Sequence, residues 1–342
     1  MNTDTDMGVY VNETLGRLSD EFYMVALIVY FLAMVLFLVS LAMAAKTRTA
    51  AGEALAAAPD RELVHAGAGG SSTTATTTAV PSAGDRTPGR IDDGPKKPRR
   101  SRSATLSAAT YPVVFIGLIA HIASIVLRGV ATERMPWGNM YEFISVTCAA
   151  AVVGGLVALR NVKYRPMMSF VLLPVLVMMF FGGTALYADA APVVPALKSY
   201  WLAIHVSVIS IASGLLVVSG VLSVLFLVKD RWPAATEILP SKESLDRLAY
   251  KCVVVGFPLL GIGIILGAIW AEAAWGRYWG WDPKETVSFI SWVIYAAYLH
   301  ARATAGWRIG AAWINVAGAA SVIFNLFAIN LVVSGLHSYA GL

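Results

Sequence analysis

Four of the five histidines in this chain lie in or beside long apolar segments, where an imidazole could bind a metal or move a proton. A histidine inside a membrane span is costly and usually marks function, although a single one can simply hydrogen-bond a neighbouring backbone. Neutral imidazole is a good ligand for haem iron, and two histidines on facing helices supply both axial positions. The four candidates are His121, His205, His300 and His337, whereas His65 lies in a polar segment and is expected to be solvated.

A tryptophan-rich stretch between two apolar segments offers a second kind of chemistry. The indoles of Trp275, Trp279 and Trp281 present flat apolar faces with one N–H donor each. Gly276 and Gly280 let the backbone bend and approach a ligand closely. The stretch therefore suits a flat, amphipathic ligand. An aromatic belt at the membrane surface is the alternative, because Trp and Tyr are enriched there.

The second half of this stretch predicts the start of a helix. Asp282 suits the N-cap position, Pro283 suits the first helical position, and Glu285 can reach back to complete a capping box. The whole stretch, residues 275–285, is called the tryptophan loop below. We expect its Asp and Glu mainly to fix the loop to the following helix, with direct contact to a ligand as the lesser role.

The composition defines the class of protein that must position these residues. Hydrophobic residues make up 57% of the 342 residues and charged residues only 14%, and the mean hydropathy is +0.66. These values indicate a polytopic membrane protein. Cys148 and Cys252 lie in or beside apolar runs and are expected to be small buried hydrophobes. The chain contains no Cys-x-x-Cys, which excludes a thiol reductant and a covalent c-type haem carrier.

Eight apolar runs predict eight transmembrane helices, so the expected fold is an all-α integral membrane protein, a polytopic helical bundle. No cleavable signal peptide is expected, because the first run follows an acidic segment and is too long for one. The runs lie at about 22–45, 111–130, 141–160, 167–187, 201–228, 252–271, 286–303 and 311–334.

Three further divisions of the chain are predicted. Residues 1–21 form a polar N-terminal segment. Residues 46–105 are rich in Ala, Gly, Ser, Thr and Pro and end in a basic cluster, so we expect a disordered cytoplasmic linker that could touch anionic lipid headgroups. Residues 106–342 form one transmembrane domain that carries the four candidate histidines.

The distribution of basic residues predicts the orientation in the membrane. Lys and Arg gather after the first run and around 160–165, 229–251 and 302–308. All of these clusters lie on one side, the cytoplasmic side, if both termini are extracytoplasmic. The basic pI of 9.2 thus reflects membrane orientation, and no nucleic acid is expected as a partner. The tryptophan loop is predicted to face the extracytoplasmic side.

This topology sorts the four histidines into two pairs by depth. His205 and His337 fall at the level of the tryptophan loop and form an outer pair. At a rise of about 1.5 Å per residue, His300 lies toward the cytoplasmic half, and His121 lies within about two turns of the same depth. Zinc requires three or four ligands, and neither pair has a matching Cys, Asp or Glu, so haem is the favoured ligand.

The tryptophan loop resembles the WWD motif of the haem-handling protein family of cytochrome c biogenesis. The matching residues are Trp275-Gly276-x-x-Trp279-x-Trp281-Asp282-x-x-Glu285. Trp201-Leu-Ala-Ile-His205 before the loop and Ser334-Gly-Leu-His337-Ser-Tyr after it resemble the outer histidine segments of that family. His121 and His300 fall where its transmembrane histidines would be. The length of the chain is similar to that of the CcsA type, also called ResC, or CcsB in actinobacteria, of System II.

The resemblance implies a function in cytochrome c maturation at the plasma membrane, as a component of a cytochrome c haem lyase complex. Haem b would be the cargo, held first between His121 and His300 and then between His205 and His337. An apocytochrome c Cys-x-x-Cys-His segment would add its thiols across the haem vinyl groups, with help from a ResB-like membrane partner. The implied support for the macrocycle comes from Trp275, Gly276, Trp279, Trp281, Asp282 and Glu285.

Two other classes of protein remain open. A transporter or permease could use midplane histidines as a proton relay, which leaves the tryptophan loop unexplained. A structural assembly subunit of a respiratory complex could use the loop as a docking surface. A haem absorption spectrum separates the first alternative from the haem-handling function. Normal cytochrome c maturation after alanine substitution of His205 and His337 would favour the second.

Overall fold

The computed structural model describes residues 11–56, 101–193, 197–304, 306–331 and 335–337. The described part of the chain is helical and contains no strand. The elements in chain order are α1 (Glu13–Ala56), α2 (Arg102–Ala131), α3 (Met140–Ala158), the short 3-10 helix η1 (Arg165–Met167), α4 (Met168–Thr184), α5 (Tyr200–Arg231), α6 (Lys242–Trp275), α7 (Pro283–Ala303) and α8 (Arg308–Leu331).

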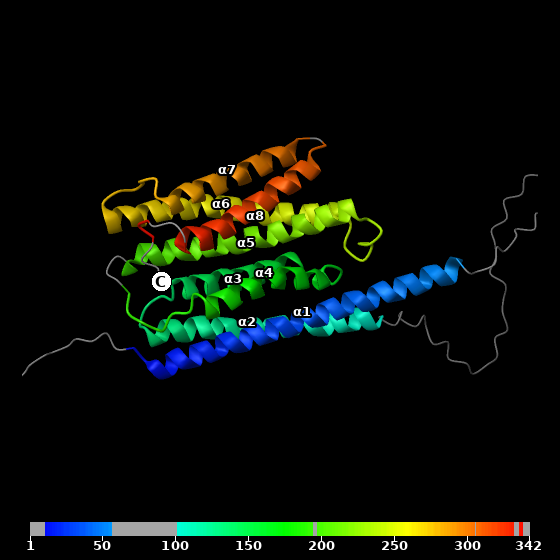
Figure 1. Cartoon of the computed structure of the whole chain (residues 1–342), viewed down its shortest axis with the longest axis horizontal. Helices are drawn as coiled ribbons and strands as arrows, with labels where there is room; N and C mark the ends of the chain where they lie inside the picture. The colour runs from blue at the N-terminus through cyan, green and yellow to red at the C-terminus, as the bar shows by residue number, and fades with distance from the viewer. Residues whose placement is uncertain (1–10, 57–100, 194–196, 305, 332–334, 338–342) are drawn as a thin grey trace, which may run out of the picture.

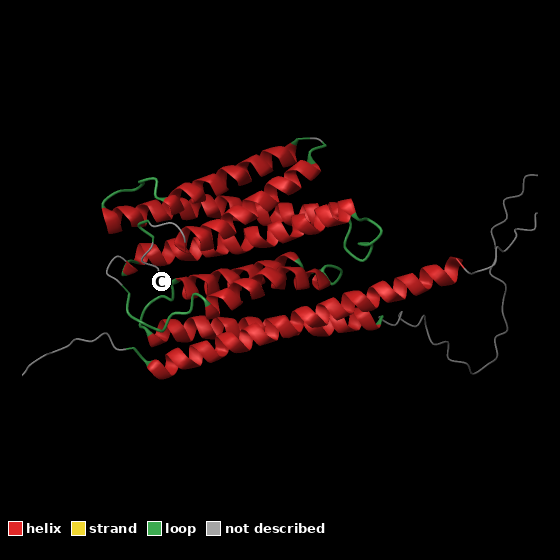
Figure 2. Ribbon diagram, viewed as in Figure 1, coloured by secondary structure: helices red, strands yellow, loops and turns green. Residues whose placement is uncertain are grey.

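The eight α-helices of the described residues confirm the prediction of a polytopic helical bundle (Figures 1 and 2). Within the described ranges, all of them except α7 are long and apolar enough to cross a membrane. The sequence of α7 is less apolar because Ser, Thr and Tyr side chains and His300 interrupt its apolar positions. It nevertheless packs lengthwise against α6 and α8 as part of the bundle (Figure 1).

Helix α1 differs most from its predicted bounds. It extends beyond both ends of the apolar run 22–45, so residues 46–56 are helical and the predicted linker is shorter at this end. At the other end of the linker, α2 begins at Arg102, where the Ser101 hydroxyl accepts the N–H of Ala104 as an N-cap. The apolar pattern marks only the membrane-embedded part of a helix, which is why it missed these polar ends. Residues 57–100 lie outside the described residues.

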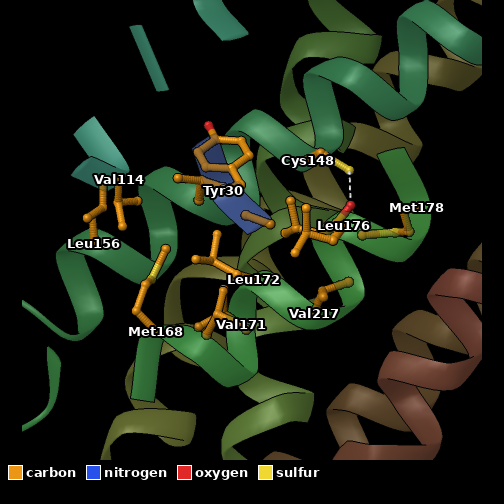
Figure 3. Packing of buried hydrophobic residues seen from close by; sticks show 14 of the residues in the cluster. Tyr30, Val114, Cys148, Leu156, Met168, Val171, Leu172, Leu176, Met178 and Val217 are labelled. Atoms are coloured by element: carbon orange, nitrogen blue, oxygen red, sulfur yellow. Dashed lines mark hydrogen bonds between the residues drawn. The ribbon is translucent and has the colours of Figure 1, made fainter. Parts of the chain in front are cut away.

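The helices pack as neighbouring pairs, α1 with α2, α5 with α6, and α7 with α8. Helix α3 lies between α4 and α5 and joins the two sides of the bundle (Figure 1). A large apolar core is formed mainly by side chains of the first six helices, α1 to α6. A second core lies between α5, α6, α7 and α8. Cys148 is buried in the first core, with its Sγ 3.8 Å from the carbonyl oxygen of Val175 (Figure 3). Cys252 is also buried and free, so both cysteines occupy the predicted apolar positions.

The connections between helices gather at two opposite ends of the bundle. The α2–α3, α4–α5 and α6–α7 connections lie at one end, drawn on the left in Figures 1 and 2. The α3–α4, α5–α6 and α7–α8 connections lie at the other end. Successive connections thus alternate between the two ends of the bundle, as predicted from the positions of the basic residues. The end that carries the tryptophan loop is called the loop end below.

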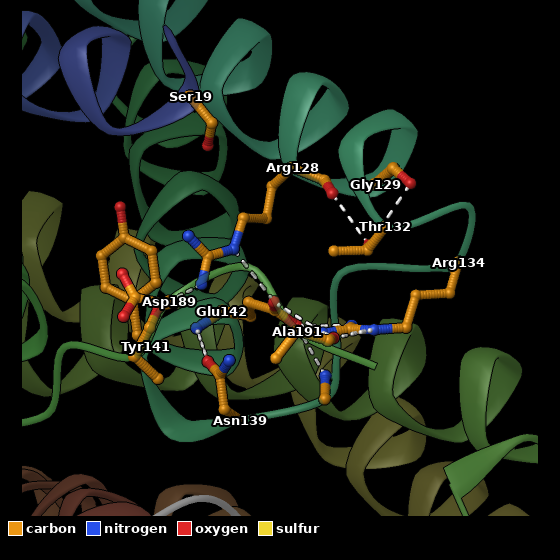
Figure 4. A network of polar contacts seen from close by, with 12 residues as sticks. Ser19, Arg128, Gly129, Thr132, Arg134, Asn139, Tyr141, Glu142, Asp189 and Ala191 are labelled. Atoms are coloured by element: carbon orange, nitrogen blue, oxygen red, sulfur yellow. Dashed lines mark hydrogen bonds and ion pairs between the residues drawn. The ribbon is translucent and has the colours of Figure 1, made fainter. Parts of the chain in front are cut away.

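A buried ion network fixes the loop end of α1, α2 and α3 (Figure 4). Arg128 Nε donates to Glu142 Oε1 at 3.1 Å, and Arg128 Nη1 donates to Asp20 Oδ1 at 3.3 Å. Arg134, in the α2–α3 connection, donates to both Glu142 oxygens at 2.8 and 3.0 Å. Arg128 also donates through Nη2 to the carbonyl of Ala188. The network therefore ties three helices to the α2–α3 and α4–α5 connections at the loop end.

Candidate functional site

A cavity opens at the loop end between α3, α5, α6, α7 and α8, and both outer histidines line it. His205 comes from α5 and His337 from the segment after α8. The indoles of Trp270, Trp275 and Trp279 form much of its aromatic wall. The structure thus brings the predicted outer pair to one cavity beside the tryptophan loop.

His205 is held in one orientation by α6. Its Nδ1 lies 2.8 Å from the carbonyl oxygen of Gly263. Because a carbonyl only accepts, Nδ1 carries the proton of the neutral ring, and Nε2 is the nitrogen with a lone pair. Gly267, one turn further along α6, lies flat against the same ring, and a Cβ there would be 2.7 Å from the His205 Cε1 atom. The carbonyl of Gly263 and the missing side chain of Gly267 therefore together form the groove on α6 that fixes this imidazole.

His337 is held by the carboxylate of Asp282. Its Nδ1 donates to Asp282 Oδ1 at 2.8 Å, and the backbone N–H of Leu336 donates to Oδ2 at 2.8 Å. Burial raises the pKa of Asp282, but the bonds from His337, Leu336 and Lys284 outweigh it and lower the pKa to about 2. The pKa of His337 is lowered, chiefly because burial disfavours the imidazolium, and the positive charge of Lys284 adds to this effect. His337 therefore stays neutral at pH 7 and can ligate through Nε2.

The tryptophan loop begins with a turn at Gly276 and ends in the predicted capping box. Gly276 has a φ of 73°, and its N–H donates to the carbonyl of Glu272 at the end of α6. Asp282 accepts the N–H of Lys284 at 3.1 Å, and Glu285 Oε2 accepts the N–H of Asp282 at 3.0 Å. The prediction of a helix start at this point is confirmed. The structure adds that Asp282 also orients His337, which the sequence pattern did not indicate.

The motif indoles do not all face the cavity. Trp275, the last residue of α6, and Trp279 line it. Trp281 is 68% exposed and is not among the lining residues. It adopts a φ of 57°, and its ring packs edge-on against Trp279 at 5.7 Å. Trp281 therefore belongs to the outer surface of the loop, and its predicted contact with a ligand is not supported by its position.

Trp270 is the main site residue that the sequence did not indicate. Its side chain is buried, and its ring centre lies 6.3 Å from that of His205, in a nearly parallel orientation, and 6.1 Å from that of His337. It also packs edge-on against Trp275 at 4.8 Å. Trp270 lies inside the apolar run 252–271, where an indole is expected simply to fill the core. The one feature of the sequence that could have indicated Trp270 as a site residue is its position five residues before Trp275.

The predicted inner pair is not brought together. His121 is fully buried on α2, with Nε2 3.0 Å from the Ser145 hydroxyl and Nδ1 3.4 Å from the Tyr30 hydroxyl. His300 is exposed near the end of α7. Figure 1 shows α2 and α7 on opposite sides of the bundle, with α3, α5 and α6 between them. Similar predicted depth does not imply a short distance across the bundle, and the pairing of His121 with His300 stays a prediction that this arrangement of helices does not support.

The fold and the site define the class: a polytopic membrane protein with two oriented histidines over an aromatic cavity at one end of its bundle. The family model of the cytochrome C assembly protein matches residues 137–337. The chain belongs to this family, and the membership gives it a function in cytochrome c maturation. The matched region contains His205, His300, His337 and the tryptophan loop, whereas His121 lies outside it.

Several relatives show the same relationship. The chain is 32% identical over 286 residues to the cytochrome c biogenesis protein CcsA of Gloeobacter violaceus, a match that covers 66% of this chain and 85% of the relative. It is 37% identical over 259 residues to CcsA of a Synechococcus species, with 65% and 84% covered. CcsA of Chlamydomonas reinhardtii is 34% identical over 248 residues, with 68% and 69% covered.

A solved structure supports the fold. The cytochrome c haem lyase CcmF superposes with a TM-score of 0.56 at 16% identity, and the match covers 96% of this chain and 48% of the lyase. This chain therefore spans about half the length of that protein. At this level of identity the likeness concerns the arrangement of helices alone.

Proposed function

We propose that this protein binds haem b at the loop end of the bundle and presents it for attachment to apocytochrome c. His205 and His337 supply the two axial ligands through their Nε2 atoms. The observation that carries this proposal is that the two histidines, far apart in the chain, line one aromatic cavity while a separate hydrogen bond donated by Nδ1–H orients each ring. Such hydrogen bonds orient ligating histidines and raise their basicity.

The residues of the cavity suit a flat macrocycle. Trp270, Trp275 and Trp279 provide apolar faces around the two imidazoles. Ligation by two histidines is one of the factors that set the reduction potential of the haem iron. The thiols of an apocytochrome c Cys-x-x-Cys-His segment then add across the vinyl double bonds, each forming a C–S bond while its proton goes to the other vinyl carbon. The contribution of this protein is orientation and exclusion of water.

The tryptophan loop also offers a surface on which a substrate and a partner protein can bind. The exposed rings of Tyr278 (61%) and Trp281 (68%) form the rim of the tryptophan loop, where an apocytochrome c segment can contact the protein. The loop faces the extracytoplasmic side of the plasma membrane, and a ResB-like membrane protein shares the work. An inner haem site is not proposed from this chain alone, because His121 belongs to α2 and His300 to α7, and these helices lie on opposite sides of the bundle (Figure 1).

A haem titration of the purified protein in mild detergent tests this function. The wild type is expected to give the split visible bands of six-coordinate, bis-histidine haem. His205→Ala and His337→Ala each remove one axial ligand, so each variant should give a five-coordinate or unbound spectrum and should fail to mature cytochrome c in cells. His65→Ala, in the predicted linker, is the matched histidine control. Wild-type spectra and normal maturation in both ligand variants would overturn the proposal.

The groove on α6 gives a second prediction, which tests orientation without removing a ligand. In Gly267→Ala the new methyl group must push against the His205 ring, because its Cβ would be 2.7 Å from Cε1. The displaced ring would lose its hydrogen bond to the Gly263 carbonyl, so we expect haem binding to weaken by about tenfold or more, as when a group that orients a metal ligand is lost. Gly310→Ala, whose Cβ would meet nothing closer than 3.7 Å, is the control. Equal haem affinity in the two variants would show that the groove does not position His205.

A further inference from the structure

A groove between α2 and α3 lies near the end of the bundle opposite the tryptophan loop, the end that the basic residues predict to be cytoplasmic (Figure 1). Its volume is about 410 Å³, within the range of pockets that bind organic ligands. On each helix the lining residues are mostly three or four positions apart, so each helix contributes one face to the groove. The lining residues are Tyr111, Phe115 and Leu118 on α2, Val153, Leu156 and Val157 on α3, Arg160 from the connection after α3, and Arg165 from η1.

The walls of the groove are apolar and open to the outside of the bundle. The Tyr111 hydroxyl donates to the carbonyl of Leu156 at 2.8 Å and so links the two helices. The side chains of Phe115, Val153 and Val157 are exposed along the walls. In a bundle that spans a membrane, such side chains contact the hydrocarbon of the bilayer. The groove is therefore accessible from the lipid and suits an apolar chain.

Two arginines lie at the polar end of the groove. The guanidinium carbon of Arg165 lies 4.2 Å from the centre of the Tyr111 ring, and Arg165 Nε donates to the Arg160 carbonyl at 3.4 Å. These contacts hold Arg165 beside the groove and leave its Nη groups available. In the part of the chain that the structure describes, neither arginine forms an ion pair with a carboxylate, and no Asp or Glu lines the groove. Lys163, exposed in the same connection, adds a third positive charge.

Two guanidinium groups at the end of an apolar groove match the chemistry of an anionic phospholipid. A guanidinium binds a phosphate through two parallel hydrogen bonds. Val153 lies seven residues before Arg160, which corresponds to about 10 Å along a helix. A phosphate at the arginines and the first part of an acyl chain along α3 therefore fit the groove together. In a zwitterionic lipid the ammonium of the headgroup already neutralises the phosphate, so a lipid with net negative charge is favoured.

We propose that this groove binds one anionic phospholipid, with its phosphate at Arg160 and Arg165 and an acyl chain between α2 and α3. The site is separate from the cavity of the outer histidines and does not depend on the proposed haem function. At the loop end, the ion pair of Arg128 with Glu142 joins α2 to α3. The bound lipid fills the space between the same two helices at their other end, so it stabilises the folded protein.

Native mass spectrometry of the delipidated protein in detergent tests the site with phosphatidylglycerol and phosphatidylcholine of identical acyl chains. The wild type should bind the first phosphatidylglycerol about tenfold or more tightly than the first phosphatidylcholine, as expected for charge-assisted hydrogen bonds. The double variant Arg160→Gln, Arg165→Gln should lose this preference. Arg231→Gln is the matched control, because Arg231 is also an exposed arginine beside an aromatic ring, that of Trp232, but lies at the end of α5 and outside the groove.

A further variant separates the groove from a general attraction of lipid to a basic surface. Val157→Trp keeps both arginines but fills the groove with an indole, so it should weaken binding of phosphatidylglycerol. Val157 is 63% exposed, and the melting temperature without lipid should therefore stay as in the wild type. A preference that survives in the double variant, or that is lost in Arg231→Gln, would overturn the proposal. Wild-type affinity in Val157→Trp would overturn it as well, and dimers that this variant disrupts would assign the groove to a second copy of the chain.

Discussion

Asp282→Leu is expected to lower the haem affinity of the purified protein by about 10- to 100-fold, the usual effect of removing a group that orients a metal ligand. The substitution removes the acceptor of the His337 Nδ1–H and of the Leu336 N–H, as well as the cap of α7. Loss of the cap alone costs only about 1 kcal/mol of stability. A large loss of affinity with a small loss of thermal stability is therefore the signature of a positioning residue.

Asp282→Asn is the matched control for this variant. An asparagine still caps a helix, and its oxygen still accepts one hydrogen bond from His337. We therefore expect a clearly smaller loss of haem affinity than with Leu, measured by the same titration. If Asn and Leu cause equal and complete loss, the negative charge of Asp282 itself takes part in binding or chemistry, and the orienting function is wrong.

Glu142→Ala is expected to be the most destabilising single change outside the cavity. The side chains of Arg128 and Glu142 are 2% and 1% exposed, so the substitution leaves a buried guanidinium without its main partner. Breaking such a pair costs about 3–5 kcal/mol, which corresponds to a fall of roughly 10 °C in the apparent melting temperature of a protein of this size. The measurement is thermal unfolding in detergent. Haem binding should weaken as well, since the network fixes connections beside the tryptophan loop.

The surface ion pair between Asp230 and Lys242 provides the comparison for Glu142→Ala. Its side chains are 29% and 43% exposed, and exposed pairs contribute about 0–1 kcal/mol. Asp230→Ala should therefore change the melting temperature very little. Similar shifts for the two variants would mean that the Arg128–Glu142 network is solvated in the detergent-bound protein and does not hold the loop end together.

Local sequence signals predicted the parts of this structure that depend on neighbouring residues. The capping box of Asp282 and Glu285 and the turn at Gly276 follow from residue type and spacing, and the structure shows both. The alternation of loops between two ends followed from the positions of the basic residues. Because each span reverses direction, the same alternation also placed His205 and His337 at one end of the bundle.

Lateral packing could not be predicted in this way. His121 and His300 have matching depths, yet α2 and α7 lie on opposite sides of the bundle, and depth carries no information about which helices are neighbours. The groove that holds His205 depends on Gly263 and Gly267 facing α5, which apolar periodicity does not reveal in a helix that is apolar almost all round. The position of Trp270 in the cavity could not be predicted for the same reason. Long-range contacts between spans decided each of these features.

The two outer histidines are held in place by different parts of the fold. His205 is wedged between two packed helices, with its ring against the backbone of Gly263 and Gly267. His337 lies beyond the end of α8 and is held by the side chain of Asp282. His205 is thus held between two long helices, whereas His337 is held by Asp282 and packs against the rings of Trp270 and Trp275. In the proposed haem site, helix packing would therefore hold one ligand, and the carboxylate at the start of α7 would hold the other.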